Sequence, residues 1–358
     1  LTPLSYVAAV LSGDREAWWR GAVRPAAEAL AEAGLTPLAL EPKEPLAIMN
    51  GTSVMTGLAC LALARADRLV RLGAVISAMA LDVTGGNAEH VDARLFAAKP
   101  HPGQARVAAW MADHLAYDPA THVPPSRLQD RYSIRCAPHV IGVLEDALPF
   151  LEGLVRVELN GVNDNPVVDP DEGAVLHGGN FYGGHVGFAM DALKLAVASC
   201  ADLHDRQLAL LVDPVTSGLP ENLVVPLPGE RAARHGFKAL LIAASALAAE
   251  ALKLTMPATA FSRSTESHNQ DKVSMGTIAA RDALRVLELS ERVLAIELLA
   301  VCQGVDLRGP EACRAASVAL RDAVRAVVPG TVEDRRHDLD LARLVDALRS
   351  GAIPLPAR

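Results

Sequence analysis

Apolar residues, mainly Ala, Leu and Val, recur at helical spacing in four long segments of the chain. These segments are residues 54–83, 186–211, 236–254 and 275–307. Between residues 293 and 301 the last segment is apolar on nearly every face, which is typical of a helix that other helices surround. Strand signals are scarce. The pattern therefore predicts an all-α fold built as a bundle of long helices.

Polar connectors rich in Pro, Gly and Asn separate the predicted helices. The three longest are residues 118–133, 159–185 and 213–236. Long loops inside compact domains are uncommon and often functional, so their side chains are the first candidates for chemistry.

Composition excludes several classes of function. The 358 residues are 51% hydrophobic and carry a net charge of -8, which disfavours binding to nucleic acid or anionic membranes. Five cysteines without a C-x-x-C pair predict neither disulfides nor a zinc site and suit a reducing cytoplasm. The longest apolar run, residues 239–249, is shorter than the roughly 20 residues of a membrane helix.

The stretch "QDRYSIRC", residues 129–136, gathers polar groups that could bind a small anion. The guanidinium of Arg135 matches a carboxylate, and the Tyr132 phenol and the Gln129 amide can each donate or accept a hydrogen bond. If Tyr132 begins a helix, Arg135 lies one turn later on the same face. An arginine that pairs with Asp130 to tie the loop to a helix is an equally good interpretation.

Two clusters are glycine-rich or lie ahead of an apolar helix. Glycines flank Phe181 in "HGGNFYGGH", so the backbone could approach a ligand closely, although a tight turn packed on the next helix explains the pattern better. Asn163 and Asn165 lie nearby, and Asn50 precedes an apolar helix as ordinary helix-capping residues do.

A further cluster, "STESHNQDKVSMG", precedes the longest predicted helix. Glu266 and Gln270 are four residues apart, so a helical turn would present both on one side. Solvated helix-capping residues are the alternative.

Five blocks in one order carry a resemblance: "NGTSVMTG", "QDRYSIRCAPHVIG", "ELNGVNDNPV", "LHGGNFYGGHVGFAMD" and "HNQDKVSMGTIAAR". Together they resemble the aromatic amino acid ammonia-lyase family, which contains histidine, phenylalanine and tyrosine ammonia-lyases and related aminomutases. The resemblance runs from Leu1 to about Arg308, so we expect a lyase body at 1–310 and a helical tail at 311–358. It implies an all-α cytoplasmic homotetramer with central helices buried in the tetramer core and active sites shared between subunits.

The resemblance also implies an electrophilic methylidene-imidazolone (MIO) ring, formed autocatalytically from an internal Ala-Ser-Gly, and no metal. In this family the tripeptide and an Asp precede a stretch like "LTPLSYVAAVL". We therefore expect the ring, the segment before it and the loop Tyr that acts as base to lie upstream of Leu1, outside this sequence.

Eight residues match the family's active site. Those expected to support catalysis are Tyr132, Asn50 and Gln129. Those expected to bind substrate are Arg135, Asn165, Phe181, Glu266 and Gln270. By resemblance, Arg135 binds the substrate carboxylate with help from Asn165, and Tyr132 lies near the ring and the leaving amine. Asn50 and Gln129 hydrogen-bond ring and substrate, Phe181 packs against the ring, and Glu266 and Gln270 lie near the substrate side chain or amine.

The residue at position 270 bears on the substrate. Histidine ammonia-lyases usually carry Glu where this chain has Gln270, and a carboxylate is the natural partner of an imidazole. The neutral amide therefore predicts a preference for Phe or Tyr over His. The alternatives are a histidine ammonia-lyase, an aromatic aminomutase or a non-catalytic helical scaffold. A Ser/His hydrolase, suggested by Ser262, Ser264, Ser267 and His268, lacks a G-x-S-x-G elbow.

Overall fold

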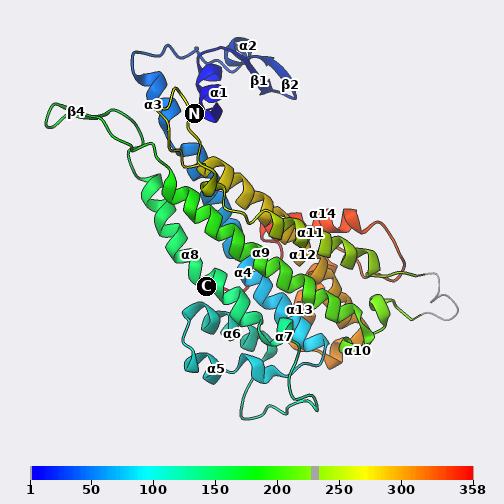
Figure 1. Cartoon of the computed structure of the whole chain (residues 1–358). Helices are drawn as coiled ribbons and strands as arrows, with labels where there is room; N and C mark the ends of the chain where they lie inside the picture. The colour runs from blue at the N-terminus through cyan, green and yellow to red at the C-terminus, as the bar shows by residue number, and fades with distance from the viewer. Residues whose placement is uncertain (1, 227–233, 358) are drawn as a thin grey trace. The chain divides into compact units, whose positions relative to one another are not determined.

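Helices dominate the structure, a computed structural model that describes residues 2–226 and 234–357 (Figure 1). Contacts group the chain into two compact units, each made of three stretches of sequence. Unit 1 comprises Leu1–Cys60, Gly153–Ala189 and Pro257–Arg281, and unit 2 comprises Leu61–Glu152, Met190–Met256 and Asp282–Arg358. The expected division at residue 310 stays a prediction.

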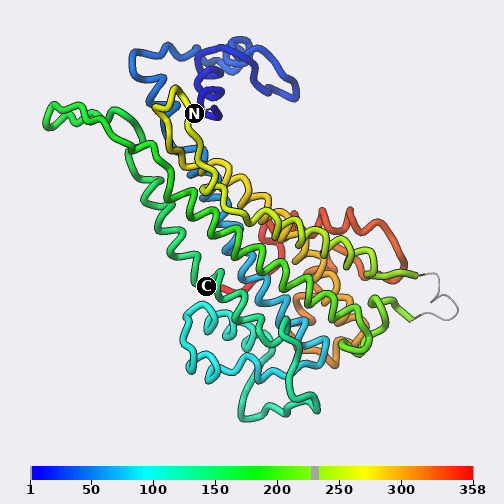
Figure 2. The backbone as a smooth tube through the Cα atoms, in the orientation of Figure 1, coloured from blue at the N-terminus to red at the C-terminus, as the bar shows by residue number. Residues whose placement is uncertain are grey.

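Four long helices each have residues in both units, and the colour changes of the backbone trace show how far apart in sequence they are (Figure 2). They are α4 (Ser53–Val83), α8 (Ala137–Leu159), α9 (Gly184–Val212) and α12 (Gly276–Arg308). Three of them confirm the predicted helices at 54–83, 186–211 and 275–307, and α11 (Lys238–Lys253) confirms the fourth. The all-α prediction is confirmed. Of the four long helices only α8 was not predicted, and it contains Pro149, which ordinarily signals a helix end.

The core of unit 2 forms around α12. Its residues from Val293 to Cys302 are all buried, which confirms that the stretch without a polar face is surrounded by other helices. Small residues let the neighbouring helices approach closely: a Cβ on Gly73 of α4 would lie 2.8 Å from the His204 imidazole of α9, and a Cβ on Gly304 of α12 would lie 2.8 Å from Val83. Substitution by Ala at either position would therefore push helices apart.

Shorter elements complete unit 2. They are η1 (Ala88–Val91), α5 (Ala93–Ala98), α6 (Pro102–Leu115), α7 (Tyr132–Arg135), α10 (Pro214–Ser217), η2 (Glu221–Leu223), α11, η5 (Pro310–Ala312), α13 (Ala315–Arg325) and α14 (His337–Ser350). Helix α6 packs against α5, η1 and α13. The predicted loops at 118–133 and 213–236 lie here; the first runs into α7, and the second contains α10 and η2, with residues 227–233 outside the described part.

Unit 1 is built from short elements around the ends of the long helices. They are α1 (Thr2–Leu11), β1 (Glu16–Trp19), β2 (Ala22–Pro25), α2 (Ala26–Glu32), α3 (Glu44–Asn50), β3 (Val167–Asp169), β4 (Ala174–Leu176) and η4 (Ala258–Phe261). The strands form two antiparallel hairpins, with Glu16 opposite Pro25 in one and Val167 opposite Leu176 in the other. The connector at 159–185 thus contains a hairpin rather than a plain loop.

The segment Glu44–Val83, which contains α3 and α4, is long and apolar enough to cross a membrane by length and composition alone. The prediction that no segment reaches that length is therefore wrong. The apolar window within it is 28% buried, while the later part of α4 contributes buried side chains from Leu69 to Val83 to the core of unit 2. The expectation of no membrane partner stays a prediction.

A histidine and a carboxyl group meet in the core of unit 2. His204 Nδ1 lies 2.6 Å from Glu297 Oε2, and both side chains have no solvent exposure. Burial raises the pKa of the Glu297 carboxyl, more than the contact with His204 lowers it. A raised pKa in the folded state means that this group's contribution to stability is complete below its ordinary pKa. That contribution is lost as the pH rises through the folded-state pKa.

We expect Glu297→Gln to be less stable than the wild-type protein at pH 5 and to close or reverse that gap by pH 8. Where the wild-type carboxyl is protonated, the variant loses a hydrogen-bonding acid and should melt about 2 °C lower, as a loss of about 1 kcal/mol implies. As the pH rises through the folded-state pKa of Glu297, only the wild-type protein acquires a buried charge, so the gap should narrow. Thermal midpoints at both pH values measure the difference, with Glu152→Gln on the exposed face of α8 as the control. A gap that does not change with pH would contradict the raised pKa.

Candidate active site

The single helical turn α7 presents Tyr132 and Arg135 side by side, as the sequence predicts for a helix that begins at Tyr132. The Arg135 guanidinium carbon lies 4.6 Å from the centre of the Tyr132 ring, and an Arg135 N–H donates to the amide oxygen of Gln129. The buried Nε of Arg135 has no hydrogen-bond partner among the described residues. Tyr132 is 73% exposed. The arrangement leaves a cation with an unused donor and an open phenol for a ligand.

A cavity of about 470 Å³ lies against these residues. It is lined by Thr84, Arg127, Gln129, Asp130, Arg131, Tyr132, Ile134, Arg135, Leu210, Val215 and Thr216. Three arginines and one aspartate leave the lining with a positive balance, so it suits a small organic anion.

Asp130 belongs to the structure of this loop rather than to the ligand. It is 6% exposed and accepts from the Asn87 N–H at 2.7 Å, with the Arg127 guanidinium 2.9 Å away and the His90 imidazole 3.1 Å away. Burial opposes its ionisation, but the contacts with His90, the Asn87 N–H and Arg127 outweigh burial and lower the pKa of Asp130. The suggested ion pair between Asp130 and Arg135 does not form; Arg127 takes that place.

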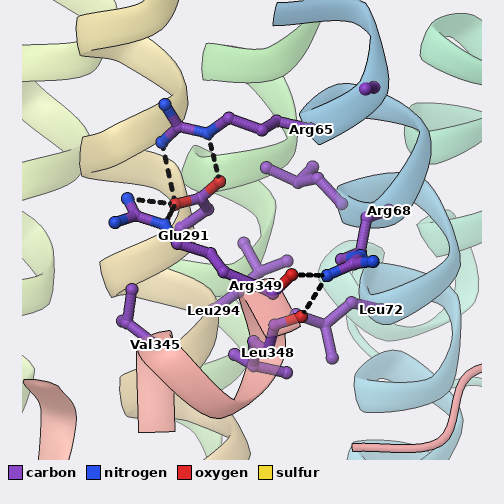
Figure 3. A pocket seen from close by; sticks show the side chains of 10 residues that line it. Arg65, Arg68, Leu72, Glu291, Leu294, Val345, Leu348 and Arg349 are labelled. Atoms are coloured by element: carbon purple, nitrogen blue, oxygen red, sulfur yellow. Dashed lines mark hydrogen bonds and ion pairs between the residues drawn. The ribbon is translucent and has the colours of Figure 1, made fainter. Parts of the chain in front are cut away.

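A second cavity of unit 2, of about 290 Å³, contains none of the predicted residues (Figure 3). Its charged groups pair with one another: Glu291 of α12 binds Arg65 of α4 at 2.7 and 2.8 Å and Arg349 of α14 at 2.6 and 2.9 Å. Arg68 donates to the Leu348 carbonyl near the end of α14, at 2.7 Å. These contacts attach α14 to α4 and α12, so we assign this cavity to packing.

In unit 1, Asn50 and Asn165 meet at Asp164. The Asn50 amide Nδ2 donates to Asp164 Oδ1 at 3.1 Å and to the Asn165 carbonyl at 3.4 Å, and Lys43 Nζ lies 2.6 Å from Asp164 Oδ2. Burial opposes ionisation of Asp164, but Lys43 and the amides lower its pKa. Asn165 Oδ1 accepts from the Gly178 N–H at 2.8 Å, while its Nδ2 has no partner among the described residues. Lys43 and Asp164 were not predicted; the polar run "NDN" was the available signal.

The glycine cluster divides into two parts. Gly183 packs closely, since a Cβ there would lie 2.3 Å from the Met55 sulfur of α4, which is an earlier helix rather than the next one that the sequence predicts. Gly178 and Gly179 face open space instead. Phe181 is 43% exposed, so its ring is available to a ligand.

Glu266 and Gln270 lie in a turn that is not helical. Thr265 and Gln270 exchange backbone hydrogen bonds of 2.9 and 3.2 Å, and Glu266, Ser267 and His268 all have positive φ between 50° and 69°. The suggestion that a helical turn puts Glu266 and Gln270 on one face is therefore wrong. Three successive non-glycine residues in the left-handed region mark a strained turn, which is frequent at functional sites.

The Ser/His pair proposed for a hydrolase does form, with Ser264 Oγ 2.8 Å from His268 Nδ1. Both residues are exposed, and among the described residues no carboxylate orients His268. A serine nucleophile needs an oriented base, so this pair does not support hydrolysis.

The structure thus joins the predicted residues into two groups. Gln129, Tyr132 and Arg135 form one in unit 2, and Asn50 and Asn165 form another in unit 1, which also contains Phe181, Glu266 and Gln270. Each unit is described by itself, so the meeting of the two groups in one site stays a prediction.

The donors in unit 1 suit a small neutral ring with a carbonyl oxygen. The Nδ2 of Asn165 offers free amide N–H groups, whereas both N–H groups of Asn50 already donate to Asp164 and to the Asn165 carbonyl, and Gly179 leaves open space nearby. Helix α1 packs against α3, which ends at Asn50, so the start of this chain belongs to the same unit as these amides. The residues present therefore fit the MIO ring expected from the resemblance.

Comparison with known proteins gives consistent results. The family model "Aromatic amino acid lyase" matches residues 1–327. The histidine ammonia-lyase of Aromatoleum aromaticum is 40% identical over 354 residues, which are 98% of this chain and 66% of that protein. The crystal structure of histidine ammonia-lyase from Trypanosoma cruzi superimposes with a TM-score of 0.91 at 34% identity, covering 99% of this chain and 67% of that one. Tyrosine aminomutase from Streptomyces globisporus gives 0.90 at 35% identity, covering 99% and 70%.

These relatives overturn the predicted preference for Phe or Tyr. The curated relatives at 40% identity over nearly the whole chain, including one from Burkholderia mallei, are histidine ammonia-lyases. The prediction of a Phe or Tyr preference was wrong because it assumed that a neutral residue at position 270 cannot bind an imidazole. The amide of Gln270 can donate to one nitrogen of a neutral imidazole or accept from the other.

Proposed function

Because the chain belongs to the aromatic amino acid lyase family, we propose that its protein eliminates ammonia from L-histidine to give urocanate. The observation that carries the proposal is the 40% identity with histidine ammonia-lyases over 98% of the chain. The chain spans 66% of the length of that relative. The Arg135 cation, which has no carboxylate partner among the described residues, and the exposed Tyr132 phenol of α7 support the same reaction.

The reaction is difficult for two reasons. The β-proton of histidine is very weakly acidic, and an amine is a poor leaving group. An MIO ring, when present, would supply an electrophile that improves the leaving group, as covalent catalysis does generally. The remaining work is to bind and orient the substrate, which can account for roughly 7–11 kcal/mol of a barrier.

In this proposal the residues of α7 fix the carboxylate and assist the amine. Arg135 binds the substrate carboxylate with the terminal guanidinium donors that Gln129 leaves free. Tyr132 exchanges a hydrogen bond or proton with the departing amine. The stacking of Arg135 over the Tyr132 ring keeps the two groups at a fixed separation.

The residues of unit 1 would hold the ring and the substrate side chain. To donate to the ring, Asn50 would turn one of its two N–H groups away from Asp164 or the Asn165 carbonyl, and the free Nδ2 of Asn165 would assist the carboxylate. Phe181 covers one face, and Gln270 and Glu266 bind the imidazole or the amine. Lys43 and Asp164 orient the two asparagines through the contacts that hold them.

We also propose a cytoplasmic homotetramer whose active sites draw residues from several subunits. The exposure of Tyr132, at 73%, supports this because a phenol that acts on a leaving group needs more enclosure than one chain gives it. Large apolar side chains exposed on α8 and α9, among them Val143, Val157 and Leu195, offer surface for subunit contact.

The test is to incubate the full-length protein separately with histidine, phenylalanine and tyrosine and to follow urocanate, cinnamate and coumarate by ultraviolet absorbance. We expect kcat/KM for histidine to exceed the other two by about 100-fold or more, since a site built to hydrogen-bond an imidazole rejects rings that lack its nitrogens. Faster elimination from phenylalanine or tyrosine would overturn the proposed substrate. A β-amino acid product would show an aminomutase instead.

Replacing Gln270 with Glu should make histidine binding depend on pH. The new carboxylate favours imidazolium over neutral imidazole. The ratio of KM for histidine at pH 6 to that at pH 9 should therefore be about two- to fivefold lower in the variant than in the wild-type protein. Steady-state kinetics at the two pH values measure the change. Asn160→Asp, an equivalent charge change at the end of α8, should leave the ratio unaltered. If the ratio of KM at pH 6 to KM at pH 9 were also unaltered in Gln270→Glu, Gln270 would not contact the substrate imidazole.

A further inference from the structure

Helix α7, which carries Tyr132 and Arg135, is too short to be stable without contacts to the rest of unit 2. It has only four residues, and one helical turn is far below the length at which a helix is stable in water. Its direction must therefore be set by contacts with other elements of unit 2.

At the break between α7 and α8, the Ser133 carbonyl takes its hydrogen-bond donor from another helix. The Cys136 N–H donates to the Tyr132 carbonyl at 2.8 Å, and the helix is interrupted at Cys136 before α8 begins at Ala137. The next carbonyl, that of Ser133, receives its donor from outside: Nε2 of Gln207 on α9, at 2.7 Å. The Ser133 carbonyl is partly buried, and a carbonyl withdrawn from water is unfavourable without a donor, so this contact ties α7 to α9.

Gln207 is itself fixed on its other side. It is fully buried, and its amide exchanges hydrogen bonds with Ser77 Oγ of α4, with Nε2 to Oγ at 3.0 Å and Oγ to Oε1 at 3.2 Å. Two long helices thus determine where the Nε2 donor points. Asp130 anchors the chain just before α7 through Asn87 and Arg127. The turn is held at both of its sides by buried polar groups.

We propose that Gln207 is a positioning residue: through the Ser133 carbonyl it holds α7 and so fixes the directions of the Tyr132 and Arg135 side chains. For catalysis this inference rests on the proposed function, because it matters only if Arg135 binds a substrate carboxylate. The effect of Gln207 on the position of α7 does not depend on the proposed function, since the contact and α7 both lie within unit 2.

The first test measures backbone protection and needs no substrate. In Gln207→Met, which keeps the side-chain length but has no donor, hydrogen exchange of the Arg135 and Cys136 amides should accelerate about tenfold. The matched control is Gln303→Met, since Gln303 is a buried glutamine of α12 that tethers the backbone at Thr331 instead. It should leave exchange in α7 unchanged. Unchanged exchange in Gln207→Met would overturn the inference, whether or not the protein is a histidine lyase.

The second test separates positioning from general loss of structure. We would measure competitive inhibition of histidine elimination by imidazole-4-propionate, which carries a carboxylate, and by histamine, which does not. In Gln207→Met the inhibition constant for imidazole-4-propionate should rise about tenfold or more while that for histamine changes less than about twofold, because only the first ligand needs Arg135. Equal changes for both would assign Gln207 a purely structural role and overturn its positioning role.

Ser77→Ala covers the possibility that Gln207→Met fails to fold. It removes a small hydroxyl and leaves Gln207 without the partner that orients its amide. The faster exchange in α7 and the rise in the inhibition constant for imidazole-4-propionate should both appear, at about a third of their size in Gln207→Met. Wild-type behaviour of Ser77→Ala in both tests would contradict the proposed chain of contacts.

Discussion

Arg135→Lys is expected to lower kcat/KM for histidine about 10²- to 10³-fold, mostly through a higher KM. Lysine keeps the positive charge but has neither the planar pair of donors that matches a carboxylate nor the donor that now reaches Gln129. It also loses the stacking over Tyr132, whose ring centre lies 4.6 Å from the guanidinium carbon. Initial rates of urocanate formation over a range of histidine concentrations measure both parameters.

The matched control is Arg292→Lys. Arg292 lies on α12, pairs with Glu288 at 2.7 Å and is half exposed, so lysine can replace it with little loss. We expect kinetics within about twofold of the wild-type protein for this variant. If Arg135→Lys were equally mild, the substrate carboxylate would have to be bound elsewhere.

Tyr132→Phe is expected to lower kcat about 10²- to 10³-fold while KM changes less than about threefold, because a proton-transfer group acts mainly in the transition state. Phenylalanine keeps the ring under Arg135, so the substitution removes only the hydroxyl. Single-turnover measurements with saturating histidine isolate the chemical step from product release.

Tyr6 provides an unusually close control. The guanidinium carbon of Arg15 lies 4.6 Å from the centre of its ring, the same separation as in the pair of Arg135 and Tyr132. Tyr6→Phe should therefore show what the loss of a hydroxyl from an arginine-stacked tyrosine does outside the proposed site. We expect no change in kcat. A similar decrease in both variants would show that Tyr132 is not a proton-transfer group.

The long helices could be predicted because burial is encoded locally. A helix that other helices surround must be apolar at every turn, and α12 shows this between Val293 and Val301. Helix α8 was not predicted because a proline such as Pro149 normally ends a helix, whereas here packing against other helices maintains it. The conformation of the turn at 265–270 was not predicted because its positive φ values depend on the backbone bridge between Thr265 and Gln270, not on the residue types.

The grouping of Gln129, Tyr132 and Arg135 was also local. Residues one helical turn apart share a face, so the sequence alone brings them together once α7 begins at Tyr132. The contacts that hold this group were not local: Gln207 and Ser133 are 74 residues apart, and Lys43 and Asp164 are 121 apart.

By itself, then, the sequence determined the all-α class, the span of three of the four long helices and the position of Tyr132 and Arg135 on one face, because periodicity and short spacing act within a few residues. Only the tertiary structure decided which partner each polar group takes: Arg127 rather than Arg135 for Asp130, and Gln207 for the Ser133 carbonyl. The physical reason is that a hydrogen bond depends on the distance and direction between two atoms. Those are fixed only when helix faces from distant parts of the chain have packed together.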